Sequence, residues 1–165
     1  MDSSDSSYYS RQQLDELFLQ MIAFFSGDPK RIQHFMKVHS FARIIGTKEG
    51  LDETSLFILE AAAYTHDIGI RPAEEKYGRC DGKLQEQEGP IVAQRMLSDV
   101  GIENYLIDRI CYLIGHHHTY DNIEGLSIYM KMTSIVTELN RHISKFSGRR
   151  PEKKFLIRCI QMKDE

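Results

Sequence analysis

Apolar residues recur along most of the chain at intervals of three and four, the spacing of amphipathic helices. The first such stretch runs from about residue 11 to residue 25 and includes Leu14, Leu17 and Met21. Similar stretches follow at about 29–47, 52–66, 88–101, 103–118 and 128–146. Before residue 149 we find no segment with the two-residue alternation of a strand. The pattern predicts an all-α protein of about six helices.

Turn-forming residues separate these stretches. Asp28 followed by Pro29 is typical of a helix start, and Asp52 is a second candidate cap. Residues 68–85 contain three glycines and a proline without helical periodicity, so we expect a functional loop there. Residues 1–10 are expected to be a flexible lead-in, residues 11–148 a single domain, and residues 149–165 a tail that forms a short helix or a strand.

Composition narrows the class of protein. A length of 165 residues suits one domain, and 21 Lys and Arg against 24 Asp and Glu give a net charge of −3. This balance argues against a nucleic-acid partner, because such proteins usually carry a basic surface. Three cysteines without paired spacing indicate a reducing compartment, and no apolar run is long enough to span a membrane. We therefore expect a cytoplasmic protein; its oligomeric state is not indicated.

Histidines are the most informative residues. The chain has seven, including the pair His66-Asp67, where a predicted helix meets a glycine-bearing turn. His34 shares a predicted helical stripe with Val38 and Phe41, so it should face the interior. Imidazole and carboxylate groups are metal ligands. Each of these residues could instead be an ordinary core histidine or helix end.

The triplet His116–His118 lies at the end of another predicted helix. Helical spacing puts His117 on the side of Ile110, and His118 on the side of Ile107, whereas His116 falls on a more polar side. Adjacent inward histidines are costly in an apolar core unless their nitrogens are paired. A metal or a carboxylate could supply the partner. We therefore prefer His117 and His118 as ligands, with His116 as the alternative.

A ligand set of histidines and a carboxylate suits manganese, iron, cobalt, nickel or zinc better than magnesium or calcium. Two such divalent ions sharing one carboxylate are a common device for hydrolysing phosphate esters, because they clamp phosphoryl oxygens and acidify a bound water. The sequence does not distinguish one ion from two.

Four segments, taken in order, resemble the HD-domain superfamily of metal-dependent phosphohydrolases, particularly its small stand-alone bacterial members. They are His34 in its helix, AAAYTHDIG at residues 61–69, GPIVA at 89–93 and IGHHHTYDN at 114–122. The resemblance extends from about residue 31 to residue 140. It implies a single HD-type helical bundle.

The resemblance also implies ligands. His34, His66 and Asp67 would bind one metal ion, and Asp67 would face a second where one is present. The residues that match the second-metal ligands are Glu88, which replaces a frequent histidine, and the pair His117 and His118.

Two positions depart from the family pattern. Ser134 stands where the family has its last aspartate ligand, with Glu138 one turn later as a substitute. Ile70 replaces a frequent lysine three residues after the HD aspartate, and Arg71 is next to it.

The first hypothesis is a phosphohydrolase acting on a phosphate ester or anhydride of a nucleotide or other small metabolite. Asp67 would orient water and the metal ions, while Arg71 and Lys76 would bind substrate phosphate. The alternative for these cations is a solvated loop paired with Glu74 and Glu75. The second hypothesis is a weakened module that binds a metal or nucleotide without turnover, which Ser134 favours.

Overall fold

The computed structural model describes the backbone of residues 3–118 and the side chains of residues 11–118. This part of the chain contains six α-helices and no strand, which confirms the prediction of an all-α fold. The predicted helix at 128–146, with Ser134 and Glu138, and the tail at 149–165 lie outside the described residues. The helices are α1 Ser3–Phe24, α2 Pro29–Lys48, α3 Glu53–Thr65, α4 Ile70–Tyr77, α5 Gly82–Asp99 and α6 Asn104–Ile114.

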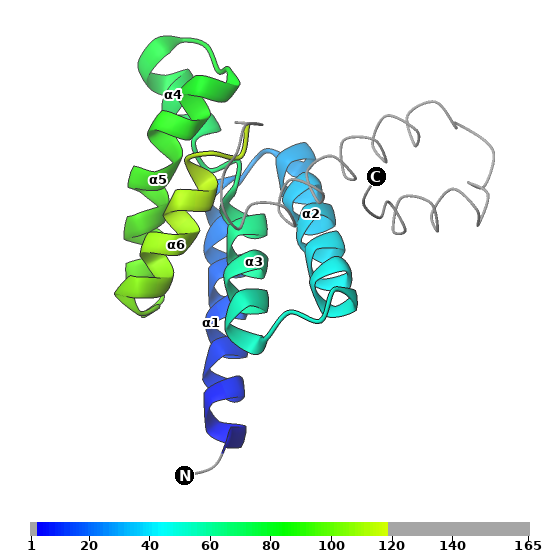
Figure 1. Cartoon of the computed structure of the whole chain (residues 1–165). Helices are drawn as coiled ribbons and strands as arrows, with labels where there is room; N and C mark the ends of the chain where they lie inside the picture. The colour runs from blue at the N-terminus through cyan, green and yellow to red at the C-terminus, as the bar shows by residue number, and fades with distance from the viewer. Residues whose placement is uncertain (1–2, 119–165) are drawn as a thin grey trace, which may run out of the picture.

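Helix α3 is the centre of the described bundle. It packs against α1, α2 and α6, while α5 packs against both α6 and α4 (Figure 1). Residues Ala61, Ala62 and Ala63 are completely buried, and their small side chains let neighbouring helices approach closely. The carboxyl end of α3 is therefore held from several sides.

Three aspartates cap helix starts. Asp28 accepts a hydrogen bond from the backbone of Arg31, with Pro29 at the first position of α2. Asp52 caps α3, and Asp81 caps α5, in the same way. Each carboxylate satisfies a backbone N–H that has no partner within its helix. None of the helices in residues 3–118 has the length and apolar character needed to cross a membrane.

The segment expected to be a loop contains a helix. Residues 70–77 form α4, and α5 begins at Gly82, earlier than the sequence predicts. The loop prediction was wrong because Pro72 lies in the first turn of α4, where a missing N–H does no harm. Gly78 ends α4 in a left-handed conformation with φ of 65°. Helix α1 likewise begins at Ser3, within the expected lead-in.

The turn after the HD pair packs closely against α5. A Cβ atom at Gly69 would meet the backbone carbonyl oxygen of Gln85, and would lie 2.8 Å from the backbone nitrogen of Gly89. A Cβ atom at Gly89 would instead meet a methyl group of Ile114 at 2.8 Å. Only glycine at position 69 allows this approach, which fixes the turn that follows Asp67.

Gly69→Ala is therefore expected to destabilise the protein by about 1–3 kcal/mol, because backbone atoms cannot move aside as side chains can. Gly89→Ala should cost less, since the Ile114 side chain can rotate. Urea unfolding of both variants measures the difference. Equal destabilisation would contradict the described packing of the turn on α5.

Candidate metal centre

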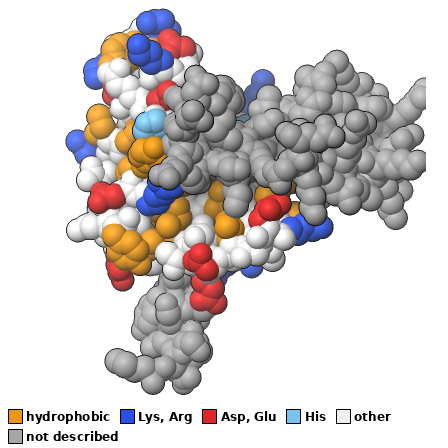
Figure 2. Space-filling model, viewed as in Figure 1, with side chains coloured by type: hydrophobic (Ala, Val, Ile, Leu, Met, Phe, Trp, Pro, Cys, Tyr) orange, Lys and Arg blue, Asp and Glu red, His pale blue; other side chains and the backbone are white. Residues whose placement is uncertain are grey.

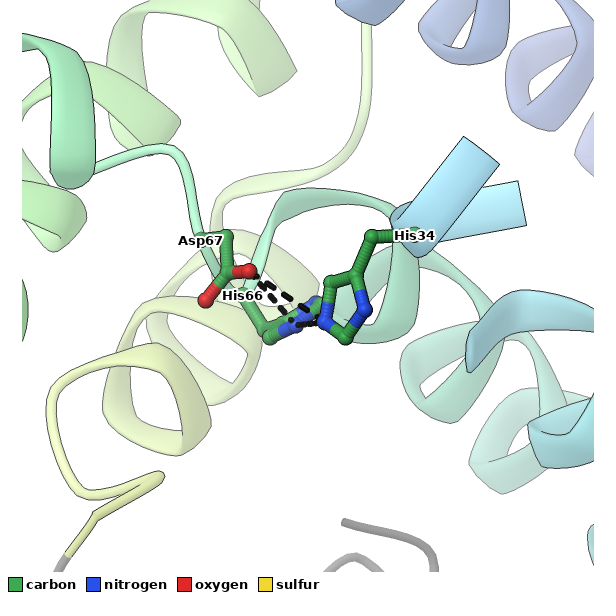
Figure 3. Close-up of side chains that lie close together, drawn as sticks. All are labelled: His34, His66 and Asp67. Carbon is green, nitrogen blue, oxygen red and sulfur yellow. Dashed lines mark hydrogen bonds and ion pairs between the residues drawn. The ribbon is translucent and has the colours of Figure 1, made fainter. Parts of the chain in front are cut away.

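Three polar side chains from two helices converge at the carboxyl end of α3 (Figure 3). His34 comes from α2, His66 caps α3, and Asp67 follows directly. The Nε2 atoms of His34 and His66 lie 3.2 Å apart. Oδ2 of Asp67 lies 3.3 Å from Nε2 of His34 and 3.2 Å from Nε2 of His66. Three potential ligand atoms thus surround one point.

Backbone carbonyls fix the orientation of two imidazole rings. Nδ1 of His66 lies 2.9 Å from the carbonyl oxygen of Ala63, and Nδ1 of His117 lies 2.6 Å from that of Ile114. A carbonyl oxygen can only accept, so Nδ1 donates the hydrogen bond in both rings. In a neutral ring the lone pair is then on Nε2, which faces Asp67. Histidine ligands of metals are commonly oriented in this way.

His117 faces the other oxygen of Asp67. Its Nε2 atom lies 3.8 Å from Oδ1, whereas His34 and His66 contact Oδ2. This Nε2 atom is buried and has no hydrogen-bond partner. A buried nitrogen without a partner is unfavourable, and a cation between it and Asp67 would satisfy it. The carboxylate is therefore placed to bridge two positions.

The pKa values of these groups are shifted by burial and by one another. Burial raises the pKa of Asp67, but the nearby His66, His34 and His117 lower it well below its ordinary value. Burial, followed by the charge of His66, lowers the pKa of His34. The same two causes lower the pKa of His117 to about 3. For His66, burial lowers the pKa, but Asp67 outweighs burial and raises it.

These shifts favour cation binding. An ionised carboxylate and neutral imidazoles are the ligand forms that metals need. The raised pKa of His66 is the exception, because it favours the protonated ring, which cannot bind a metal through Nε2. The donor set of imidazole nitrogens and carboxylate oxygens therefore fits a divalent transition metal. Within residues 11–118, the group close enough to hold one ion is His34, His66 and Asp67.

Glu88 and Lys76 are bound to each other. Oε1 of Glu88 accepts hydrogen bonds from Nζ of Lys76 at 3.1 Å and from the hydroxyl of Tyr77 at 2.8 Å. These hydrogen bonds hold the pKa of Glu88 below its ordinary value. The bond from the Tyr77 hydroxyl lowers the pKa most, and the bond from Lys76 comes second. The structure thus does not place Glu88 in the group around Asp67, and the charge of Lys76 is already paired.

Other predicted residues point elsewhere. Arg71 donates hydrogen bonds to Glu75 and to the carbonyl oxygen of Phe24 in α1. Nε of Arg71 lies 3.1 Å from Oε1 of Glu75. Figure 2 shows basic and acidic side chains side by side at the α4 end of the molecule. His118 is exposed and contacts Gln85, contrary to the expectation that it faces inward. That expectation failed because α6 ends at Ile114, so helical spacing does not continue to residue 118.

Sequence reasoning missed the two carbonyl groups that orient the histidines. A signal for them exists, because each of His66 and His117 lies three residues after its acceptor, at the end of a helix. The last carbonyls of a helix have no intrahelical partner and are free to accept such bonds. His116 makes a similar bond to the carbonyl of Tyr112, and its ring lies against the Tyr112 ring, with centroids 4.4 Å apart.

Comparison with known protein families identifies the class. The family model described as HD domain matches residues 31–163, which is most of the chain. The protein therefore belongs to the HD domain family, as the sequence motifs predict. Its members are generally hydrolases that bind divalent metals, and some are non-catalytic. Searches of curated proteins and of solved structures gave no match.

His66→Ala is expected to weaken binding of Mn²⁺ or Zn²⁺ by more than the roughly 10–100-fold that loss of an outer partner causes. The variant removes a ligand whose Nε2 faces Asp67. His116→Ala is the matched control, and should bind the metal like the wild type. Isothermal titration of metal-stripped protein measures both. Equal losses in the two variants would place the metal elsewhere.

Proposed function

We propose that this protein is a metal-dependent phosphohydrolase acting on a phosphate ester or anhydride of a nucleotide or other small metabolite. The observation that carries the proposal is the arrangement around Asp67. One carboxylate oxygen faces His34 and His66, while the other faces the unpartnered nitrogen of His117. A carboxylate used from both sides suits a pair of metal ions better than one structural ion.

The proposed ligands are His34, His66 and Asp67 for one divalent ion, with Asp67 and His117 facing a second. Manganese, iron, cobalt, nickel and zinc all suit this donor set. When bound, such ions clamp phosphoryl oxygens and lower the pKa of a water ligand.

The residues around Asp67 orient the proposed metal ligands and leave one side of the centre open to substrate. Hydrogen bonds from His66 and His117 to backbone carbonyls hold their Nε2 atoms toward Asp67. The side chain of His34 is 35% exposed, whereas that of His117 is 2% exposed. Substrate would therefore reach the centre from the side of His34.

Lys76 is the proposed phosphate-binding cation. Its side chain is 58% exposed, so it could leave Glu88 and pair with a substrate phosphate. Arg71 is bound to Glu75 and to α1, which favours a structural role for it. We therefore assign only Lys76 to the substrate.

The alternative function is binding of a metal or nucleotide without turnover. The pairing of Lys76 with Glu88 favours it, because the charge needed for a phosphate is already used. Ser134, at the position of the family's last aspartate, also favours it. In the hydrolase, and in a module that binds a nucleotide, the ligand is a small phosphorylated molecule. The free thiols Cys80 and Cys111 agree with the proposed cytoplasmic location.

Asp67→Asn is expected to lower phosphatase activity at least about 100-fold and to release bound metal, because the amide lacks the charge that holds the ions. The control is Asp99→Asn, at the exposed end of α5. The assay uses p-nitrophenyl phosphate, its bis-ester and a panel of nucleotides, with elemental analysis of each protein.

Loss of both metal and activity in Asp67→Asn alone supports the proposed hydrolase. Stoichiometric metal in the wild type without turnover of any phosphate compound would contradict it and would favour the binding module. Activity that survives in Asp67→Asn would show that the reaction does not depend on this centre.

A further inference from the structure

A second polar site lies at the opposite end of α3 from the HD pair. A cavity of about 940 Å³ is lined by the first half of α3, by Arg11 of α1, by Arg43 of α2 and by the start of α6. From Thr54 to Thr65 the helix rises about 16 Å. None of the residues that line this cavity belongs to the group around Asp67.

A buried carboxylate organises the cavity. Glu60 is 3% exposed, and its Oε1 atom accepts a hydrogen bond from Nη1 of Arg43 at 3.2 Å. Nη1 of Arg11 lies 3.7 Å from the same oxygen, and Nε2 of His39 lies 2.9 Å from it without hydrogen-bond alignment. Burial raises the pKa of Glu60, but His39 and Arg43 lower it below its ordinary value. Glu60 is therefore ionised and draws two arginines together.

The two arginines exceed the charge of Glu60. Both arginine side chains are 50% exposed and line the cavity, and each guanidinium group offers more N–H donors than Glu60 accepts. Arg11 has a second contact, from its Nε to Oδ1 of Asp15 at 3.6 Å, whereas the polar partner of Arg43 in residues 11–118 is Glu60. An anion would complete the pairing of Arg43. The planar guanidinium group of Arg43 can donate two parallel hydrogen bonds to a carboxylate.

The start of α6 adds to this preference, whereas the start of α3 is already capped by Asp52. Glu53 and Thr54 at the start of α3, and Glu103 and Tyr105 at the start of α6, line the cavity. Helix amino ends carry partial positive charge and unpaired N–H groups. Glu103 precedes α6 without capping it through its side chain.

The remaining walls limit the ligand. The carboxylates of Glu53 and Glu103 also line the cavity, so a multiply charged phosphate would be repelled. Leu14, Phe57 and Leu106 supply an apolar surface. We propose that this cavity binds a small molecule with a single carboxylate group on an apolar or aromatic body, held by Arg43 and Arg11.

The test compares 2-naphthoate with 2-naphthamide, its uncharged counterpart, on the full-length protein by isothermal titration. The wild type should bind naphthoate at least about tenfold more tightly than naphthamide, since only the anion pairs with the guanidinium groups. Arg43→Met, which keeps the length of the side chain, should lose about this factor. Asp67→Asn, at the other end of α3, should bind naphthoate like the wild type.

Glu103→Gln provides a second measurement if Arg43→Met fails to fold. Removal of a repelling carboxylate should tighten naphthoate binding severalfold, an effect that a purely structural role would not produce. Equal binding of the two probes, no binding of naphthoate at millimolar concentration, or unchanged affinity in Glu103→Gln would overturn the proposal. Because Asp67→Asn is the control variant here, a result that overturns carboxylate binding at this cavity is distinct from one that overturns the proposed hydrolase.

Discussion

The position of one carboxylate, Asp67, governs the described structure. It lies at the end of the central helix among three imidazole rings, in surroundings where a lone negative charge would be strongly unfavourable. Its ionisation is sustained by His66, His34 and His117, and their rings are in turn aimed by the helices that carry them. The caps that start α2 and α3, and the close approach at Gly69, all serve to hold this group together.

The two carboxylate oxygens of Asp67 face different histidines. Oδ2 meets the two histidines from α2 and α3, and Oδ1 meets the histidine that follows α6. Since α3 packs on both α2 and α6, the helical packing itself brings the two halves of the centre together. In the proposed function, substrate would reach the centre past the partly exposed His34 and the α4 region, where Arg31, Arg71 and Lys76 are paired with acids.

Much of the fold could be predicted from the sequence, because amphipathic spacing and aspartate caps are local signals. The pair His66-Asp67 and the inward position of His117 were also within reach, since each follows an apolar helical face. Helix α4 was missed because glycines and Pro72 hide a short helix whose first turn tolerates proline. His118 was misplaced because the helix end at Ile114 depends on packing around Gly115. The pairing of Lys76 with Glu88 joins two helices, and no local pattern reports such a contact.

The proposed function requires the Nε2 atoms of His34 and His66 to face one metal ion held by Asp67, and that of His117 to face a second. Long-range ¹H–¹⁵N spectra of the histidine rings, recorded during a Zn²⁺ titration and assigned with single histidine variants, test it directly. We expect the Nε2 signals of these three rings to move, while Nδ1 of His66 and His117 stays protonated. Metal-dependent shifts confined to other histidines, or deprotonation at Nδ1 of His66, would contradict it.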